Sequence, residues 1–354
     1  MNESTFPPSI SSRNTSETST SSLETNNSSF PTVIRTPDNL AAIIFCLSIA
    51  VIGVIGNVLV IGIKTWKYKS STHQVFIIGL AITDILVCGL VMPINSVEML
   101  MKYSFYTTII GRVIRTMDHM LVYISVLIVT EMSIDQYRKI CYPTKSQMTP
   151  KIAAIIISMT ILVAFGLAIP VTFVRRVNID RDFINEGYFD CKINDEENPL
   201  NVAYDVVLLI IYVATNFIII GIYVIIGKTV FNQIDFRINL AGKTFKKSFV
   251  VNRGRRKVLE ASSRKIVKIT FLISLVFLIS YLPILVLYIH ENINGWYLIS
   301  PCSLYNPAMA VIERFYGFNH MANPFIYGFF DKNFRNEISM LVTKIFTCKK
   351  SNLK

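Results

Sequence analysis

Acidic side chains lie inside stretches of this sequence that are otherwise strongly apolar. Asp84 lies in one such stretch, Asp118 and Glu131 share another, and Glu313 lies in a last one. A carboxylate that faced lipid would cost at least ~2.5 kcal/mol, so we expect these side chains to face a protein interior. There a carboxylate can hold a small hard cation or, nearer the surface, a cationic ligand. The pattern predicts binding chemistry and no enzyme, because it contains no nucleophile–base pair, phosphate loop or metal-ligand cluster.

The composition indicates what surrounds these acids. Of the 354 residues, 52% are hydrophobic and only 16% are charged, and the mean hydropathy is +0.48. A soluble protein needs more charge to cover its surface, and the same numbers exclude disorder or coiled coil for the whole chain. The sequence therefore predicts a membrane protein that crosses the bilayer several times.

Apolar stretches long enough to span the bilayer occur seven times, since a helix needs about 20 apolar residues to cross the hydrocarbon core. Nothing alternates with a period of two, so helices are the expected form. We predict an all-α membrane protein, a seven-transmembrane helix bundle followed by a short amphipathic eighth helix from Asp331. The predicted spans are Leu40–Ile63, Val75–Met101, Ile109–Ile134, Ile152–Val174, Val202–Ile226, Ile266–Ile289 and Tyr305–Phe330.

Charge sets the predicted orientation. Most of the 35 Lys and Arg residues lie after spans one and three, in the long loop Lys228–Lys265 and in the carboxyl-terminal tail. The segment between Arg175 and Leu200 is acidic instead. Basic loops stay in the cytosol, so we expect an extracellular amino terminus and a cytosolic carboxyl terminus at the plasma membrane. The net charge of +12 is then interpreted as attraction to membrane lipid rather than to nucleic acid.

The domain organisation follows from these boundaries. Residues 1–38 are rich in Ser, Thr and Asn without an apolar core, which predicts a disordered extracellular tail rather than a signal peptide. Residues 39–330 form the seven-helix domain, and residues 331–354 form the amphipathic helix and a short tail. The extracellular tail carries four N-x-[ST] sequons, which predict glycosylation at Asn2, Asn14, Asn26 and Asn27.

Several short motifs fall at matching places in the spans. Asn57 lies in a Gly-Asn-Val-Leu-Val run, Leu-Ala-Ile-Thr-Asp ends at Asp84, and Asp135-Gln-Tyr137 closes the third span. Asn323-Pro-Phe-Ile-Tyr327 closes the seventh and runs into an Asp-Lys-x-Phe-Arg segment. Together they resemble the rhodopsin-like (class A) G-protein-coupled receptors, most like the neuropeptide receptors, over about residues 40–348. The resemblance implies heterotrimeric G protein and arrestin as cytosolic partners, and no cofactor apart from a sodium ion.

The resemblance assigns roles to polar and aromatic residues along the bundle. A sodium ion, or else a water network, would sit at Asp84 as the metal ligand, and two prolines should kink spans six and seven. Two inward tyrosines would meet in the active state. The polar core comprises Asp84, Ser125, Asn319 and Asn323; the activation switches are Asp135, Gln136, Tyr137, Tyr223, Phe277, Tyr281, Pro283, Pro324 and Tyr327.

The outer residues indicate a ligand. The position of Asp118 matches the acid that amine receptors and some peptide receptors use for a cationic group, and Glu313 adds a second acid unless Arg115 or Arg314 neutralises them. The aromatic pair and hydroxyls of amine receptors are missing, so we favour a basic neuropeptide over a biogenic amine. Retinal is excluded because span seven has no lysine before Lys332. The predicted ligand-binding residues are Asp118, Glu313, Glu98, His119, Tyr204, Tyr288 and His290.

The sequence also departs from the family pattern. Gln136 replaces the arginine that pairs with its neighbouring acid, bridges to span six and contacts G protein, and Ser263 replaces the span-six acid. The alternative to a signalling receptor is therefore a decoy that only removes ligand. Gly111 stands where the family has a cysteine, which leaves Cys191 to pair with Cys302 or to stay free. Cys348, beside two lysines, is a candidate for palmitoylation.

Overall fold

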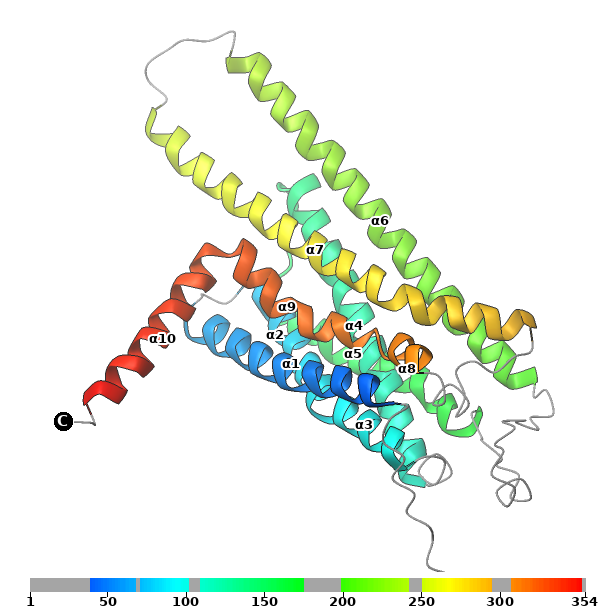
Figure 1. The fold of residues 1–354 in the computed structure, drawn as a ribbon. Helices are drawn as coiled ribbons and strands as arrows, with labels where there is room; N and C mark the ends of the chain where they lie inside the picture. Colours follow the sequence, from blue (N-terminus) through cyan, green and yellow to red (C-terminus); the bar gives the residue numbers. More distant parts are fainter. Residues whose placement is uncertain are drawn as a thin grey trace, which may run out of the picture. The chain divides into compact units, whose positions relative to one another are not determined.

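The computed structural model describes residues 39–67, 71–101, 109–174, 199–241, 250–294 and 307–351. Its residues are helical almost throughout, as predicted (Figure 1). The predicted glycosylation sites, the two predicted disulfide cysteines and most of the acidic outer segment lie outside the described residues. The helices are α1 (Leu40–Lys67), α2 (Thr72–Leu86), η1 (Val87–Val91), α3 (Met92–Met101), α4 (Ile109–Cys141), α5 (Pro150–Val174), α6 (Pro199–Ala241), α7 (Val250–Asn294), α8 (Pro307–Glu313), α9 (Gly317–Phe330) and α10 (Lys332–Ser351).

The bundle is organised around α4, which packs against α2, α5, α6 and α7, while α1 packs against α2 and α9. We call the end at which α1 begins the outer end, and the end at which α1 finishes the inner end. Large apolar side chains such as Ile55, Phe165 and Phe217 are exposed, whereas Asn57 and Asp84 are fully buried. This inverted distribution is stable only when lipid surrounds the bundle.

Six of the described helices are long and apolar enough to cross a membrane by length and composition. The predicted seventh span is present from Pro307 but is divided into α8 and α9, neither of which is long enough alone. The division lies at Arg314–Tyr316, where the backbone N–H groups of Arg314, Phe315 and Gly317 bond three residues back. Such i→i+3 bonds tighten the turn. The break keeps Glu313 and Arg314 buried beside each other.

The second span is also interrupted. Its middle forms the π-helical turn η1, in which the Met92 N–H bonds to the Val87 carbonyl five residues back. Pro93 is the second residue of α3, and because it has no backbone N–H it cannot donate a regular α-helical hydrogen bond. The extra residue of a π turn rotates the helix beyond it, so η1 sets the direction in which α3 presents its side chains.

The predicted long inner loop Lys228–Lys265 is mostly helix, which corrects that boundary. Helix α6 continues to Ala241 and α7 already begins at Val250. The two helices project beyond the rest of the bundle (Figure 1). Lys, Arg, Gln and Glu are good helix formers in water, so the loss of apolar character ends the membrane span without ending the helix.

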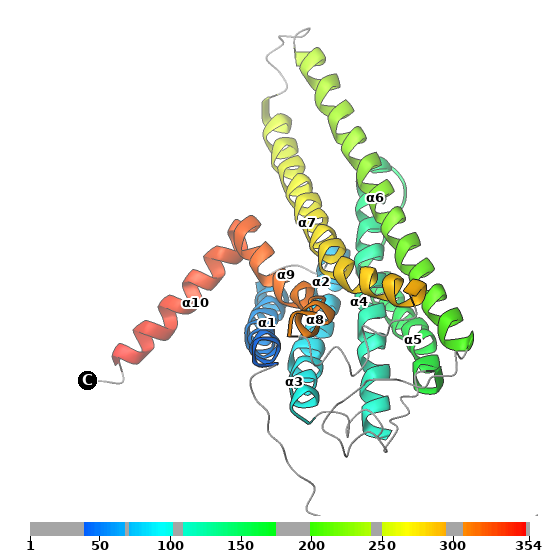
Figure 2. The ribbon, with the colours of Figure 1, turned by 45° about the vertical axis from the view of Figure 1, so that its right-hand side comes forward.

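Prolines lie inside two of the helices that close the bundle. Pro283 lies within α7 and Pro324 within α9. Helix α7 changes direction along its length (Figure 2), as an interior proline predicts. Gly56 of α1 lies so close to α9 that an added Cβ would come 2.6 Å from the Pro324 ring. The small residue therefore lets the two helices approach.

The predicted amphipathic eighth helix is α10. Asp331 ends α9, and its carboxylate accepts the backbone N–H groups of Asn333 and Phe334, at 3.1 and 3.2 Å. A carboxylate that caps the first turn in this way fixes where a helix begins. Phe334 is buried and meets Tyr327 edge to face, which anchors α10 to the bundle.

Candidate functional site

Asp118, the predicted ligand acid, lies in the outer half of α4 and is bonded to the turn before α9. The Tyr316 hydroxyl donates to its Oδ2 at 2.9 Å, and Asn95 of α3 donates to the same hydroxyl at 3.3 Å. The other carboxylate oxygen, Oδ1, is buried and has no hydrogen-bond partner among the described residues. Tyr316 thus holds the carboxylate from one side and leaves one oxygen for a further donor.

Glu313, the second predicted acid, is neutralised within the protein. Its carboxylate accepts from Arg314 at 2.9 Å, and both side chains are buried. The alternative in which Arg314 cancels this charge is therefore the one observed. A paired, buried carboxylate presents little free charge to a ligand. Asp118 remains the better-placed acid for a cationic group.

The other predicted ligand residues lie at separate places. The His119 ring nitrogen Nδ1 lies 2.9 Å from the Arg115 carbonyl one turn back in α4. The Tyr204 hydroxyl donates to the Leu167 carbonyl at 2.9 Å, which ties α6 to α5. Glu98 is buried in α3. Tyr288 and His290 belong to the outer end of α7, but their side chains lie outside the part of the chain that the structure describes.

The polar core gathers around Asp84 in α2. Both of its carboxylate oxygens accept N–H donors from α9: Asn323 Nδ2 reaches Oδ2 at 2.7 Å and His320 Nδ1 lies 2.8 Å from Oδ1. Asp84 and His320 have no exposed side-chain surface. The other nitrogen of His320 lies 3.2 Å from the Tyr281 hydroxyl of α7. The structure thus brings Asp84 and Asn323 together as predicted and adds His320, which the sequence analysis did not single out.

Two further members of the predicted core remain without partners. The side-chain oxygens of Ser125 and Asn319 are buried and make no hydrogen bond within the described part of the chain, and the same holds for the Asn323 amide oxygen. Asn57 of α1 instead bonds the backbone, where its Nδ2 donates to the His320 carbonyl at 2.9 Å. Asn57 therefore fixes α1 to the segment of α9 that carries the core.

One face of α9 and the turn before it connects the outer site to the inner end. Side chains on this face recur at spacings of three or four residues, which places them on one side of a helix: Tyr316, His320, Asn323, Tyr327 and Asp331. Tyr316 packs edge to face against His320, with ring centroids 6.4 Å apart. A shift of the outer site can thus reach the inner end through contiguous contacts.

Aromatic rings of α6 and α7 lie against this face. Phe277 and Tyr281 of α7 pack with centroids 4.6 Å apart, and Tyr281 lies 5.9 Å from Tyr316. Tyr212 of α6 contacts both α7 rings. Close packing of this kind changes between discrete arrangements rather than continuously, which suits a switch.

At the inner end of α4, Asp135 has partners that the sequence analysis did not name. Lys139, one turn on, forms an ion pair with it at 2.5 Å, and Thr72 of α2 donates to it at 3.1 Å. Gln136 is buried and its amide lies 3.4 Å from a ring nitrogen of His73. Because Lys139 balances Asp135, the missing arginine leaves no unpaired buried charge at this place.

The predicted switch tyrosines occupy different surroundings. The Tyr223 hydroxyl of α6 lies 3.4 Å from Ser133 of α4 and 3.4 Å from Ser274 of α7. Tyr327 is buried in α9, where the ammonium of Lys64 lies 5.2 Å from its ring centroid. Tyr137 meets Tyr142 edge to face. Their switching roles stay predictions.

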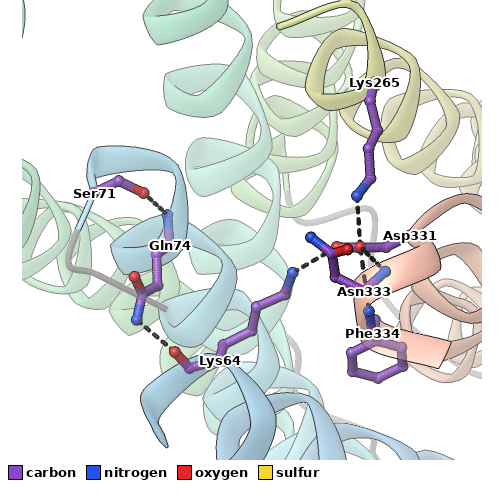
Figure 3. A network of polar contacts seen from close by, with 7 residues as sticks. All are labelled: Lys64, Ser71, Gln74, Lys265, Asp331, Asn333 and Phe334. Carbon is purple, nitrogen blue, oxygen red and sulfur yellow. Dashed lines mark hydrogen bonds and ion pairs between the residues drawn. The ribbon is translucent and has the colours of Figure 1, made fainter. Parts of the chain in front are cut away.

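A second ionic junction joins α1, α7 and the start of α10 (Figure 3). Asp331 accepts from Lys265 of α7 at 2.6 Å and from Lys64 of α1 at 3.1 Å. Lys64 is itself nearly buried, and its carbonyl accepts the Gln74 amide at 2.6 Å. Burial alone would raise the pKa of Asp331, but the hydrogen bonds and charges of Lys265 and Lys64 outweigh burial and hold that pKa below its usual range. The junction therefore stays ionised at neutral pH.

Comparison with known proteins identifies this arrangement. The chain matches the family model described as 7 transmembrane receptor (rhodopsin family) over residues 56–327. It belongs to the rhodopsin family of seven-transmembrane receptors. The fold is similar to that of squid rhodopsin, with a TM-score of 0.67 and 22% identity over 88% of this chain and 83% of that one. At this identity the likeness concerns the fold alone.

Curated relatives of this rhodopsin-family receptor include receptors named for peptides. The RYamide receptor of Tribolium castaneum is 26% identical over 89% of this chain and 82% of its own length. Neuropeptide FF receptor 2 of Mus musculus is 26% identical over 82% of this chain and 69% of its own length. The type-1 angiotensin II receptor A of Xenopus laevis is 25% identical over 84% of this chain and 78% of its own length.

The family resemblance implied a sodium ion at Asp84, and the donor set does not fit that ion. Hard cations take oxygen ligands, and each oxygen of this carboxylate already accepts one N–H donor, whose hydrogen brings partial positive charge to the place that a cation would take. No group of three or more His, Cys, Asp or Glu side chains in the described ranges could hold a metal ion. The oxygens of Ser125, Asn319 and Asn323 are neutral and supply no charge.

Sequence reasoning missed His320, Tyr316 and Thr160. Thr160 of α5 donates to Glu131, an acid of the third span for which the sequence offered only Arg138 or Lys139 as partners, and Lys139 pairs with Asp135 instead. His320 carried a signal, since it lies one residue after one predicted core residue and three before another. Tyr316 lies one turn before His320, so the same helical spacing could have found it.

Proposed function

We propose that this receptor binds an extracellular peptide at the plasma membrane and signals through a heterotrimeric G protein, with its amino terminus outside. The main support is the series of contacts that runs from Asp118 to Tyr316, on to His320, and from there to Asp84 and Asn323 in the middle of the bundle. A receptor needs such a path because a ligand acts only by favouring one packing over another. The basic inner segments support the orientation.

Peptide ligands are supported by the relatives, whose names refer to RYamide, neuropeptide FF and angiotensin II. The free oxygen of Asp118 supports a ligand with a cationic group, because an N–H donor from such a group would complete its hydrogen bonding. A basic side chain or the amino terminus of a peptide carries that donor. The remaining peptide would contact the outer ends of α3, α6 and α7.

The inner surface supports coupling even without the arginine of the third span. Asp135 is held by Lys139 and Thr72, so the inner end of α4 keeps a defined conformation. Helices α6 and α7 extend well beyond the bundle and, together with α10, offer helical surface to a cytosolic partner (Figure 1). G protein is the partner that we propose for this surface, and arrestin would share it.

Peptide recognition is tested in cells that carry the full-length receptor at the surface. A panel of basic peptides and biogenic amines is applied, and G-protein activation is recorded. Binding is then measured with a labelled form of the first peptide that proves active. We expect a peptide to be active and Asp118→Asn to weaken its binding by about tenfold or more, since one charged hydrogen bond contributes about 1.5–3 kcal/mol.

Glu131→Gln is the matched control for Asp118→Asn, because Glu131 lies on the same helix but bonds Thr160. Its peptide binding should equal that of the native receptor. Activity of an amine alone, or equal loss of peptide binding in both variants, would contradict the proposed peptide site.

A further inference from the structure

The imidazole of His320 lies at the centre of the buried polar core and bridges two other helices. Its Nδ1 is 2.8 Å from Asp84 Oδ1 on α2, and its Nε2 is 3.2 Å from the Tyr281 hydroxyl on α7. A neutral imidazole has one donor and one acceptor nitrogen. The network assigns them: Nδ1–H donates to the carboxylate and Nε2 accepts the tyrosine O–H.

This network uses both oxygens of Asp84. His320 donates to one and Asn323 to the other, at 2.8 and 2.7 Å, and all three side chains are almost fully buried. A cation that approached the carboxylate would meet the hydrogens of these donors. Neutral oxygens alone do not balance the cost of removing an ion from water. The geometry therefore opposes sodium binding as long as the imidazole stays in place.

Rotation of the imidazole out of the core would be costly. Tyr281 is 5% exposed and His320 is fully buried, so neither group could turn to solvent for a new partner. A buried donor or acceptor that loses its partner costs about 1–3 kcal/mol. Asn57 also holds the backbone of His320 in place through its carbonyl.

From this geometry we propose that His320 occupies the place of a metal ion in the core of this receptor, so that the native protein does not bind sodium at Asp84. The imidazole of α9 holds α2 and α7 in place through its two hydrogen bonds, whereas a bound ion would hold the helices through its charge. Three buried oxygens, from Ser125, Asn319 and Asn323, remain without partners in the described part of the chain. Without the imidazole, the Asp84 carboxylate and these three oxygens could coordinate a sodium ion together. Replacing His320 by a small residue therefore creates a sodium site.

Thermal unfolding of the purified full-length receptor tests this proposal without any peptide ligand. The midpoint Tm is measured in sodium chloride and in choline chloride at equal ionic strength. A ligand that binds only the folded state raises Tm, so a sodium site produces a sodium-specific rise. For the native receptor we expect the same Tm in both salts.

His320→Ser is expected to gain a sodium-specific rise of about 2–4 °C, the size expected when sodium exceeds its Kd several-fold. The rise should vanish when Asp84→Asn is added to that variant. His119→Ser, a histidine change in α4 away from Asp84, is the matched control and should show no sodium effect.

A sodium-specific rise in the native receptor that Asp84→Asn removes would overturn the proposal. So would a folded His320→Ser variant that responds identically to both salts. If His320→Ser does not fold, sodium-23 NMR of the native receptor decides: line broadening that depends on Asp84 refutes the proposal, and its absence supports it.

Discussion

The ion pair between Lys265 and Asp331 should restrain the inner end of α7, and Lys265→Gln tests this restraint. The pair joins α7 to the start of α10, where Asp331 also pairs with Lys64. Gln136 and Ser263 stand where the family resemblance leads one to expect an arginine and an acid that would bridge spans three and six. Lys265→Gln therefore removes the observed restraint and leaves Asp331 with its second partner.

The size of the expected change in basal signalling follows from the geometry of the ion pair between Lys265 and Asp331. The two atoms are 2.6 Å apart, and the side chains of Lys265 and Asp331 are 32% and 6% exposed. A hydrogen bond between charged groups contributes about 1.5–3 kcal/mol when buried, and solvent at the lysine reduces this to about 1 kcal/mol. That free energy corresponds to about a fivefold change in an equilibrium constant. We expect Lys265→Gln to raise basal signalling by about fivefold, provided that the active state is a minor population.

The assay records G-protein activation without ligand in cells matched for surface receptor. Lys265→Arg should keep the low basal level, because its guanidinium also reaches the carboxylate. Lys332→Gln removes an exposed cation next to Asp331 and serves as the control. Unchanged basal signalling in Lys265→Gln, or an equal rise in Lys332→Gln, would show that the ion pair between Lys265 and Asp331 does not restrain α7.

Three further predictions concern folding. Thr160→Val leaves the partly buried carboxylate of Glu131 without its donor, so the Tm of the purified receptor should fall, corresponding to a loss of about 1 kcal/mol, and an unchanged Tm would contradict this. Gly56→Ala places a Cβ 2.6 Å from the proline ring of α9 and should lower surface expression, whereas Gly62→Ala, with nothing within 4 Å, should not; equal expression of both would show that this contact is unimportant. The pKa of Asp331 is lowered on folding, so its ionised form stabilises the receptor above the unfolded-state pKa of about 3.9, and this contribution is lost as pH falls through the lower folded-state value. The Tm difference between native receptor and Asp331→Asn should therefore be constant from neutral pH to about pH 5 and shrink only below about pH 4; a difference that disappears near pH 6 would contradict the assignment.

Much of the fold could be predicted because lipid imposes simple rules. Spans must be helical and apolar, and polar residues within them must face inward. The pairing of Asp84 with Asn323 was expected from the family motifs, and the structure contains it. The division of span seven could not be predicted, because it depends on local hydrogen bonds at Arg314–Tyr316 rather than on hydropathy.

Two of the remaining discrepancies, at Asp331 and at His320, arise because packing decides which residues far apart in sequence become partners. Asp331 was predicted only as the start of an amphipathic helix, but its partners Lys64 and Lys265 come from α1 and α7. Hydropathy also placed the inner ends of α6 and α7 too close to the bundle, since these helices continue into water. The motifs identified Asp84 as a candidate ion ligand, but they could not show that the imidazole of His320 is hydrogen-bonded to its carboxylate.

We propose that this receptor signals although Gln136 stands in place of the arginine expected in the third span. The most direct measurement compares the native receptor with Gln136→Arg at equal surface level, with a panel of basic peptides and with G-protein activation and internalisation recorded together. We expect a peptide to activate G protein through the native receptor, because Lys139 and Thr72 already hold Asp135 in place. Internalisation without activation in the native receptor, with activation only in Gln136→Arg, would contradict it and identify a receptor that removes its ligand.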